Sequence, residues 1–158
     1  MEDHTLKIFH DPHQLSGTVP FEGKKVVWTN GCFDLFHPGH LHSLKEASNY
    51  GDVLIVGLNS DTSVRRLKGT DRPIFSQKFR AEHLALLSIV DAVLLFDDLQ
   101  PLSALRIIKP NVYAKGADYE VNQLEEAKLV SGLGGQIITL SMLESPSTTD
   151  LIDKIRLL

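Results

Sequence analysis

Short apolar runs, separated by polar segments, recur along the chain from residue 25 onward. Runs of four to six residues rich in branched aliphatic side chains are typical of strands buried on both faces of a sheet. We expect strands at 26–29, 53–58, 92–96, 111–114 and 136–140. Apolar residues at helical spacing between these runs predict helices at 39–50, 60–67, 76–88, 101–108, 123–130 and 149–157, with Ser76 as an N-cap.

This alternation of strands and helices predicts an α/β fold. Right-handed βαβ units give a Rossmann-like, doubly wound, five-stranded parallel sheet with helices on both faces. Residues 1–24 contain Pro12, Gly17, Pro20 and Gly23, so we expect an irregular N-terminal extension followed by one folded domain at 25–158. Such a sheet binds its ligand at the carboxyl ends of the strands, where the strand order reverses.

Composition narrows the class of protein. A chain of 158 residues with 42% apolar and 23% charged residues fits one domain with a proper core. The net charge of −4 argues against charge-driven binding to DNA or RNA. The single cysteine, Cys32, excludes an intrachain disulfide, and no apolar run approaches the length of a membrane span. We therefore expect a cytoplasmic protein that contacts neither nucleic acid nor membrane.

Candidate chemistry lies where the first predicted strand ends. Asn30-Gly31-Cys32-Phe33-Asp34 is followed by His37-Pro38-Gly39-His40 at the start of a helix. Gly31 allows backbone to approach a phosphate, the helix N-terminus favours an anion, and both imidazoles can donate hydrogen bonds. Taken alone, two histidines near a helix start are more often capping or surface residues. A zinc site is the other alternative, but a third ligand is not evident, so we predict no metal ligands among the side chains.

These segments resemble the G-x-F-D and H-x-G-H signatures of the nucleotidylyltransferase superfamily. Ser147-Thr148-Thr149 resembles its second signature, and the resemblance covers roughly residues 25–155. Within the superfamily, the chain is most similar to the adenylyltransferase domain of ADP-heptose synthases. That closer match rests on the segments 59–61, 66–69, 72–73 and 115–119, with Ala117 where the family usually has glycine.

The resemblance implies a reaction and a set of site residues. AMP would pass from ATP to a heptose 1-phosphate, giving ADP-heptose and pyrophosphate, for synthesis of activated heptose used in lipopolysaccharide or other glycans. Mg²⁺ would be carried by the ATP phosphates, and the protein would be a homo-oligomer, most simply a dimer. The expected catalytic residues are His37, His40, Lys68 and Arg80. The expected nucleotide-binding residues are Gly31, Cys32, Phe33, Asp34, Gly39, Lys115, Gly116, Asp118, Ser147, Thr148 and Thr149.

Several of these residues have plain structural alternatives. The basic loop around Lys68 could be solvated surface, and Arg80 could form a surface ion pair. A β-turn would explain 116–118, and Ser147 could simply cap a helix. Asp34 could orient a histidine, attract the metal or hold a turn.

Two other functions remain open at this point. Glycerol-3-phosphate cytidylyltransferases share both signatures and use CTP, but they typically carry an arginine before S-T-T, where this chain has residues 142–146 without a basic side chain. A non-catalytic nucleotide-binding module is the alternative of another class, because a fold does not fix a function.

Overall fold

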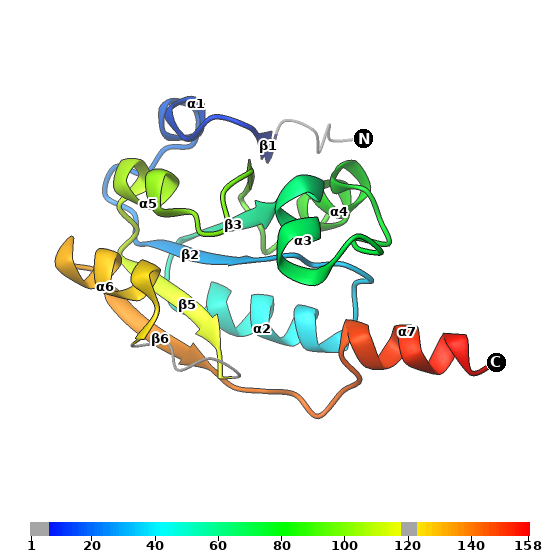
Figure 1. Ribbon diagram of the computed structural model, residues 1–158. Helices are drawn as coiled ribbons and strands as arrows, with labels where there is room; N and C mark the ends of the chain where they lie inside the picture. The colour runs from blue at the N-terminus through cyan, green and yellow to red at the C-terminus, as the bar shows by residue number, and fades with distance from the viewer. Residues whose placement is uncertain (1–6, 118–122) are drawn as a thin grey trace.

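Six parallel strands form one sheet in the order β1-β4-β3-β2-β5-β6. The computed structural model describes residues 7–117 and 123–158 (Figure 1). The strands are β1 (Ile8–Phe9), β2 (Val26–Gly31), β3 (Val53–Asn59), β4 (Ala92–Phe96), β5 (Val112–Gly116) and β6 (Gln136–Leu140). The helices are α1 (Pro12–Thr18), α2 (Pro38–Ser48), α3 (Asp61–Lys68), α4 (Gln77–Ala85), α5 (Leu102–Ile108), α6 (Glu125–Gly132) and α7 (Thr148–Arg156).

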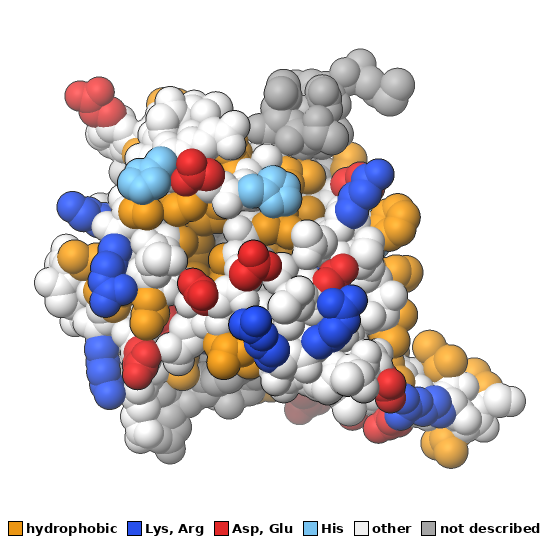
Figure 2. All heavy atoms as spheres, turned by 45° about the horizontal axis from the view of Figure 1, so that its top comes forward, with side chains coloured by type: hydrophobic (Ala, Val, Ile, Leu, Met, Phe, Trp, Pro, Cys, Tyr) orange, Lys and Arg blue, Asp and Glu red, His pale blue; other side chains and the backbone are white. Residues whose placement is uncertain are grey.

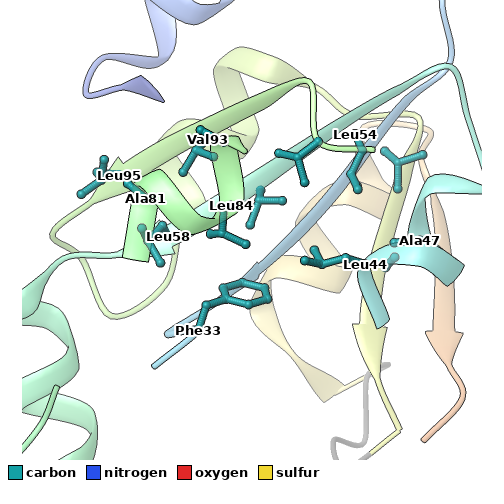
Figure 3. Packing of buried hydrophobic residues seen from close by; sticks show 14 of the residues in the cluster. Phe33, Leu44, Ala47, Leu54, Leu58, Ala81, Leu84, Val93 and Leu95 are labelled. Atoms are coloured by element: carbon teal, nitrogen blue, oxygen red, sulfur yellow. The ribbon is translucent and has the colours of Figure 1, made fainter. Parts of the chain in front are cut away.

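Two apolar clusters fill the space between the sheet and its two helical layers. Alternate residues of β3 divide between them, since Leu54 and Val56 face α2 and α4 whereas Val53 and Ile55 face α1, α5 and α6. Figure 3 shows the first cluster, in which Leu44 of α2 and Leu84 of α4 cover this face of the sheet. The predicted α/β class, the parallel sheet and the helices on both faces are confirmed.

The sixth strand comes from the segment that we expected to be irregular. That expectation is wrong for residues 8–18, which form β1 and α1. β1 has two residues, too few for a periodic pattern, and pairs with β4 at the sheet edge. Pro12 begins α1 rather than breaking it, because the Asp11 side chain caps the helix by accepting a hydrogen bond from the His13 backbone. Leu15 of α1 is fully buried, so this segment packs into the same core.

The other predicted elements are present, with ends shifted by a few residues. α4 ends at Ala85, three residues earlier than expected. Ser76 stands at its N-cap, but the Ser76 side chain makes no capping hydrogen bond. The first turn is held instead by Gln77, whose backbone N–H donates to Asp61 and whose side chain accepts from the Asp61 backbone.

The strand order fixes where a ligand can bind. From β2 the chain passes outward through β3 and β4, and then crosses back to β5 and β6 on the other side of β2. The order therefore reverses between β2 and β5, and the crevice expected of a doubly wound sheet opens at their carboxyl ends. Within the described residues, no helix is long and apolar enough to cross a membrane.

Candidate active site

A cavity of about 350 Å³ opens at the carboxyl ends of β2, β5 and β6. The N-terminal turns of α2 and α7 form two of its walls, and the end of α3 contributes a basic side chain. Its lining includes these residues expected from sequence: Gly31, Cys32, Phe33, Asp34, His37, Gly39, His40, Lys68, Lys115, Gly116, Ser147, Thr148 and Thr149. Segments that are far apart in the sequence are thus brought to one site.

Two expected residues are not found in the described lining, for different reasons. Arg80 is absent from the cavity lining, and Asp118 lies outside the described residues. The lining also includes residues outside the expected catalytic and nucleotide-binding sets, among them Thr29, Asn30, Ser43, Arg72 and Ser145. Thr29 and Asn30 could have been found from their place at the end of β2, and Ser43 from its place one turn after His40. Ser145 has no such signal, because its position depends on the path of a loop.

The two motif histidines are stacked on each other. Their ring centroids are 3.7 Å apart with planes inclined by 30°, and Phe33 and Phe36 pack against His40. The Nδ1 atoms of His37 and His40 are buried and, within residues 7–117 and 123–158, have no hydrogen-bond partner. Both residues line the cavity, and a proton on Nε2, the other ring nitrogen, could serve a ligand there.

Burial keeps both rings neutral. Burial and, to a smaller extent, the neighbouring His37 outweigh the opposite effect of Asp34, and together they lower the pKa of His40 to about 4. Burial also lowers the pKa of His37 below its ordinary 6.5. At neutral pH the pair is thus uncharged, and each ring can donate one hydrogen bond without the repulsion that two stacked cations would suffer.

Gly39 allows two chain segments to meet beside these rings. A Cβ atom at this position would lie 2.9 Å from the Ser145 hydroxyl oxygen and 3.0 Å from His37 Nδ1. The glycine of the H-x-G-H segment therefore permits the loop before α7 to close on the first turn of α2. His37 itself is the N-cap residue of α2 but makes no side-chain capping bond, which leaves its ring for the cavity.

Asp34 holds the loop that follows β2. Its carboxylate accepts hydrogen bonds from Arg72 Nε at 2.7 Å, Ile74 N at 2.8 Å and Phe75 N at 3.0 Å. Burial by itself would raise the pKa of Asp34, but these donors outweigh burial and hold the pKa below its ordinary value. The residues on either side of Asp34, Phe33 and Leu35, adopt left-handed backbone conformations with φ of 47° and 44°. The bonds to Asp34 fix a turn that the backbone alone disfavours.

Arg80 acts from behind the cavity wall. Its side chain is fully buried, and it donates to the carbonyl oxygens of Cys32, Asn59 and Phe75 and to the Asp61 carboxylate. These bonds join the ends of β2 and β3 to α3 and to the loop before α4. The expected contact between Arg80 and substrate is therefore not what the geometry favours, because most of its donors are already engaged.

Three basic side chains remain on the wall: Lys68, Arg72 and Lys115. Lys115 Nζ donates to the Asn30 carbonyl oxygen at 2.9 Å, which sets it across the end of β2. Burial raises the pKa of the Cys32 thiol although Lys68, Arg80 and Lys115 lower it. Cys32 is therefore a neutral thiol, unsuited to act as a nucleophile.

The N-terminus of α7 closes the remaining side. Ser147 and Asp150 form a reciprocal capping box, and the Ser147 hydroxyl also donates to the Asp150 carboxylate. The Thr148 hydroxyl donates to the Asp34 carbonyl oxygen at 2.6 Å. This bond docks the helix start against the loop after β2, where its backbone N–H groups suit an anion.

Comparison with known proteins places this site in a family. Residues 28–154 match the family model described as cytidylyltransferase-like. The chain belongs to the cytidylyltransferase-like family. It is accordingly a nucleotidyltransferase with a nucleotide-binding site.

Curated relatives of this cytidylyltransferase-like chain bear the name bifunctional protein HldE. The protein from Geobacter metallireducens is 46% identical over 144 residues, which are 89% of this chain and 29% of that protein. The protein from Gluconobacter oxydans is 47% identical over 130 residues, which are 82% of this chain and 27% of that protein. The chain thus spans less than a third of the length of these relatives.

Solved structures agree with the fold. A lipopolysaccharide core biosynthesis protein from Thermoplasma volcanium superposes with a TM-score of 0.62 at 29% identity, covering 78% of this chain and 99% of that one. A pantoate-beta-alanine ligase from Francisella tularensis superposes with a TM-score of 0.64 at 18% identity, covering 96% of this chain and 78% of that one. The second likeness is one of fold alone.

The positive charge at the cytidylyltransferase-like site is confined to the cavity. Over the face seen in Figure 2, basic and acidic side chains are interspersed and form no continuous patch of one sign. Among the described residues, no group of three His, Cys, Asp or Glu side chains is arranged to hold a metal ion. The positive character of the cavity comes instead from Lys68, Arg72, Lys115 and the α7 N-terminus.

Proposed function

We propose that this chain transfers AMP from ATP to a heptose 1-phosphate, giving ADP-heptose and pyrophosphate. The observation that carries the proposal is the stacked pair His37 and His40, which lines a cavity walled by basic side chains and a helix N-terminus. Such a cavity suits a triphosphate, because it offers several donors at separate points along a chain of negative charge.

The transfer step needs no covalent intermediate with the protein. A phosphate oxygen of the sugar 1-phosphate attacks the α-phosphorus of ATP, forming the new P–O bond. The bond from the α-phosphorus to the bridging oxygen breaks, and pyrophosphate leaves with the electron pair. The nucleophile is already an anion, so the step requires no general base, and catalysis reduces to positioning and charge stabilisation.

In this proposal the two histidines act as neutral donors. Each Nε2–H donates to a phosphate oxygen on which negative charge grows as the bond to pyrophosphate breaks. Because the lowered pKa values keep both rings neutral, the donors need not change protonation state during the step. Lys68, Arg72 and Lys115 neutralise the β- and γ-phosphates and the sugar phosphate, and the backbone N–H groups of Thr148 and Thr149 receive a further phosphate.

Mg²⁺ fits this site as an ion that binds together with the nucleotide, and not as one held by protein side chains. Asp34 is the acidic residue among the described residues of the cavity wall, and its carboxylate oxygens are already engaged by Arg72, Ile74 and Phe75. The ion would therefore be held by phosphate oxygens and water, as is usual for Mg²⁺ with nucleotides, and would neutralise charge on the triphosphate.

The choice of ATP and of a heptose rests on the loop before α7 and on two sequence segments. Residues 142–146, of which Met142, Leu143 and Ser145 line the cavity, contain no basic side chain, unlike the cytidylyltransferases described above. The name of the lipopolysaccharide core biosynthesis protein from Thermoplasma volcanium agrees with a role in glycan precursors, which the resemblance at 66–69 and 115–119 also implies. We propose a cytoplasmic location, where ATP is available, and a homodimer.

A screen of nucleotides against sugar phosphates, followed by pyrophosphate release, tests the proposal. We expect rapid release with ATP and heptose 1-phosphate in the presence of Mg²⁺, and release at least about 100-fold slower with CTP, because a site that hydrogen-bonds one base rejects another strongly. Rapid release with CTP and glycerol 3-phosphate, but not with ATP and heptose 1-phosphate, would assign the chain to the cytidylyltransferase reaction instead.

A further inference from the structure

The 141–147 loop, between β6 and α7, forms one wall of the cavity and is held at few points. Met142 and Leu143 line the cavity with 66% and 42% of their surface exposed. Within residues 7–117 and 123–158, none of residues 142–146 makes a hydrogen bond. The position of this wall therefore depends on the contacts at the two ends of the loop.

At the α7 end of the loop, the Thr148 hydroxyl donates to the Asp34 carbonyl oxygen. At the β6 end, Ser141 contacts a cluster of side chains on α2. The backbone N–H and the hydroxyl of Ser141 donate to the same oxygen of Glu46, at 2.9 and 2.6 Å. His42 Nε2 lies 2.8 Å from the Ser141 hydroxyl oxygen. Because that hydroxyl gives its proton to Glu46, it accepts from His42.

The loop thus runs along α2 in a fixed register. Ser141 lies against Glu46 and His42, and Ser145 approaches Gly39 at the helix start. The same helix carries His37 and His40 at its N-terminus, so the loop and the histidines share one rigid support. A shift of Ser141 along α2 would move Met142 and Leu143 relative to the histidines.

We propose that Glu46, with His42, is a positioning residue that sets the 141–147 loop against the nucleotide site. Glu46 does not line the cavity, so it acts through Ser141 and not by touching substrate. Losing this anchor leaves Met142 and Leu143 free to occupy several positions, and binding a ligand must then restrict them. The cost falls on substrate binding and not on the chemical step, because His37 and His40 keep their own support at the start of α2.

This inference rests on the proposed function for its kinetic readout. In pyrophosphate release by the full chain, we expect Glu46→Ala to raise KM for ATP about three- to tenfold. This fold-change corresponds to the free energy of a partly exposed, charge-assisted hydrogen bond. We expect kcat to stay within about twofold of wild type. Glu46→Gln keeps an uncharged acceptor of the same shape, so it should fall between Glu46→Ala and wild type. Lys45→Ala, at an exposed position on the same helix, should leave both constants unchanged.

A ligand-free measurement separates this inference from the proposed function. Glu144 is an exposed residue in the middle of the loop, and a glutamate-specific protease can cut the chain after it. We expect faster cleavage at Glu144 in Glu46→Ala than in wild type or Lys45→Ala. The urea midpoint of unfolding should be unchanged in Glu46→Gln. Equal cleavage in all the proteins would overturn the inference, as would a loss of kcat without a rise in KM. Failure of wild type to release pyrophosphate would overturn the proposed function and leave the cleavage result standing.

Discussion

The Thr148 hydroxyl donates a 2.6 Å hydrogen bond to the Asp34 carbonyl oxygen, across 114 positions of the sequence. This buried bond joins the turn after β2 to the first residue of α7. The two motifs that sequence comparison treats as separate signatures are therefore parts of one hydrogen-bonded unit. Changes to either residue should disturb the other.

Thr148→Val tests this connection, because valine keeps the shape and removes the hydroxyl. We expect the free energy of unfolding to fall by about 1–2 kcal/mol, since the Asp34 carbonyl oxygen loses its donor in a buried place. Pyrophosphate release should fall as well, because the N-terminus of α7 is no longer docked. Thr148→Ser restores the donor and should recover most of both quantities; equal losses in the two variants would argue against the bond.

Arg80→Lys tests the positioning role of the buried guanidinium. Lysine cannot reach the carbonyl oxygens of Cys32, Asn59 and Phe75 together, so we expect a loss of about 3–5 kcal/mol in the free energy of unfolding. Arg106→Lys, at an exposed position of α5, is the matched control and should change stability by less than about 0.5 kcal/mol. A folded Arg80→Lys protein of unchanged stability would show that these bonds are dispensable.

Gly39→Ala tests the close approach at the start of α2. The added methyl group would meet the Ser145 hydroxyl and the His37 ring at 2.9–3.0 Å, so the loop or the ring must shift. We expect pyrophosphate release to fall at least about tenfold, because displacements of about 1 Å in a catalytic group are costly. Gly132→Ala is the control: no atom lies within 4 Å of its added Cβ, and it should keep wild-type activity. Wild-type activity in Gly39→Ala would refute the steric argument.

Stability should depend on pH through the buried histidine. The pKa of His40 is about 4 in the folded protein and near 6.5 when unfolded, so the unfolded chain binds more protons between these values. The free energy of unfolding should therefore decrease as pH falls from 6.5 to 4, by up to about 2–3 kcal/mol. Asp34 affects stability at lower pH. Because its pKa is lowered in the folded protein, it stabilises the fold above pH 3.8, and this stabilisation is lost as pH falls further.

Urea unfolding at several pH values measures this dependence. His40→Gln removes the titrating ring but keeps a donor near the Nε2 position, so its stability should change less between pH 6.5 and 4 than that of wild type. The loss below pH 3.8 should remain in this variant. An equally steep decline in both proteins above pH 4 would place the titration in another group.

The sequence predicts the parts of this molecule that depend on local pattern. The strands β2, β3, β4 and β5 carry buried apolar runs, and the site residues around His37 follow from the motif and its place at a strand end. The strand β1 could not be predicted, because two residues carry no periodicity and their pairing with β4 is a tertiary contact. Pro12 and Gly17 also indicate a break unless the cap by Asp11 is known.

The roles of Arg80 and Asp34 depend on contacts that a sequence does not display. Arg80 lies on a predicted helix, yet its side chain passes inward to reach Cys32 and Asn59 instead of the cavity. Asp34 could have bound a metal or a histidine, and only the approach of Arg72, Ile74 and Phe75 shows that its oxygens are engaged. Both functions arise where loops from different strands meet, so local pattern carries no signal for them.

The central claim is that the Nε2 atoms of His37 and His40 stabilise charge on the phosphate being transferred. Single-turnover pyrophosphate release from ATP and heptose 1-phosphate, measured beside the dissociation constant for ATP, tests it most directly. We predict that His37→Ala and His40→Ala each slow release at least about 100-fold while ATP affinity changes much less, and that the glutamine variants recover part of the rate. Release near the wild-type rate in both alanine variants would contradict the account.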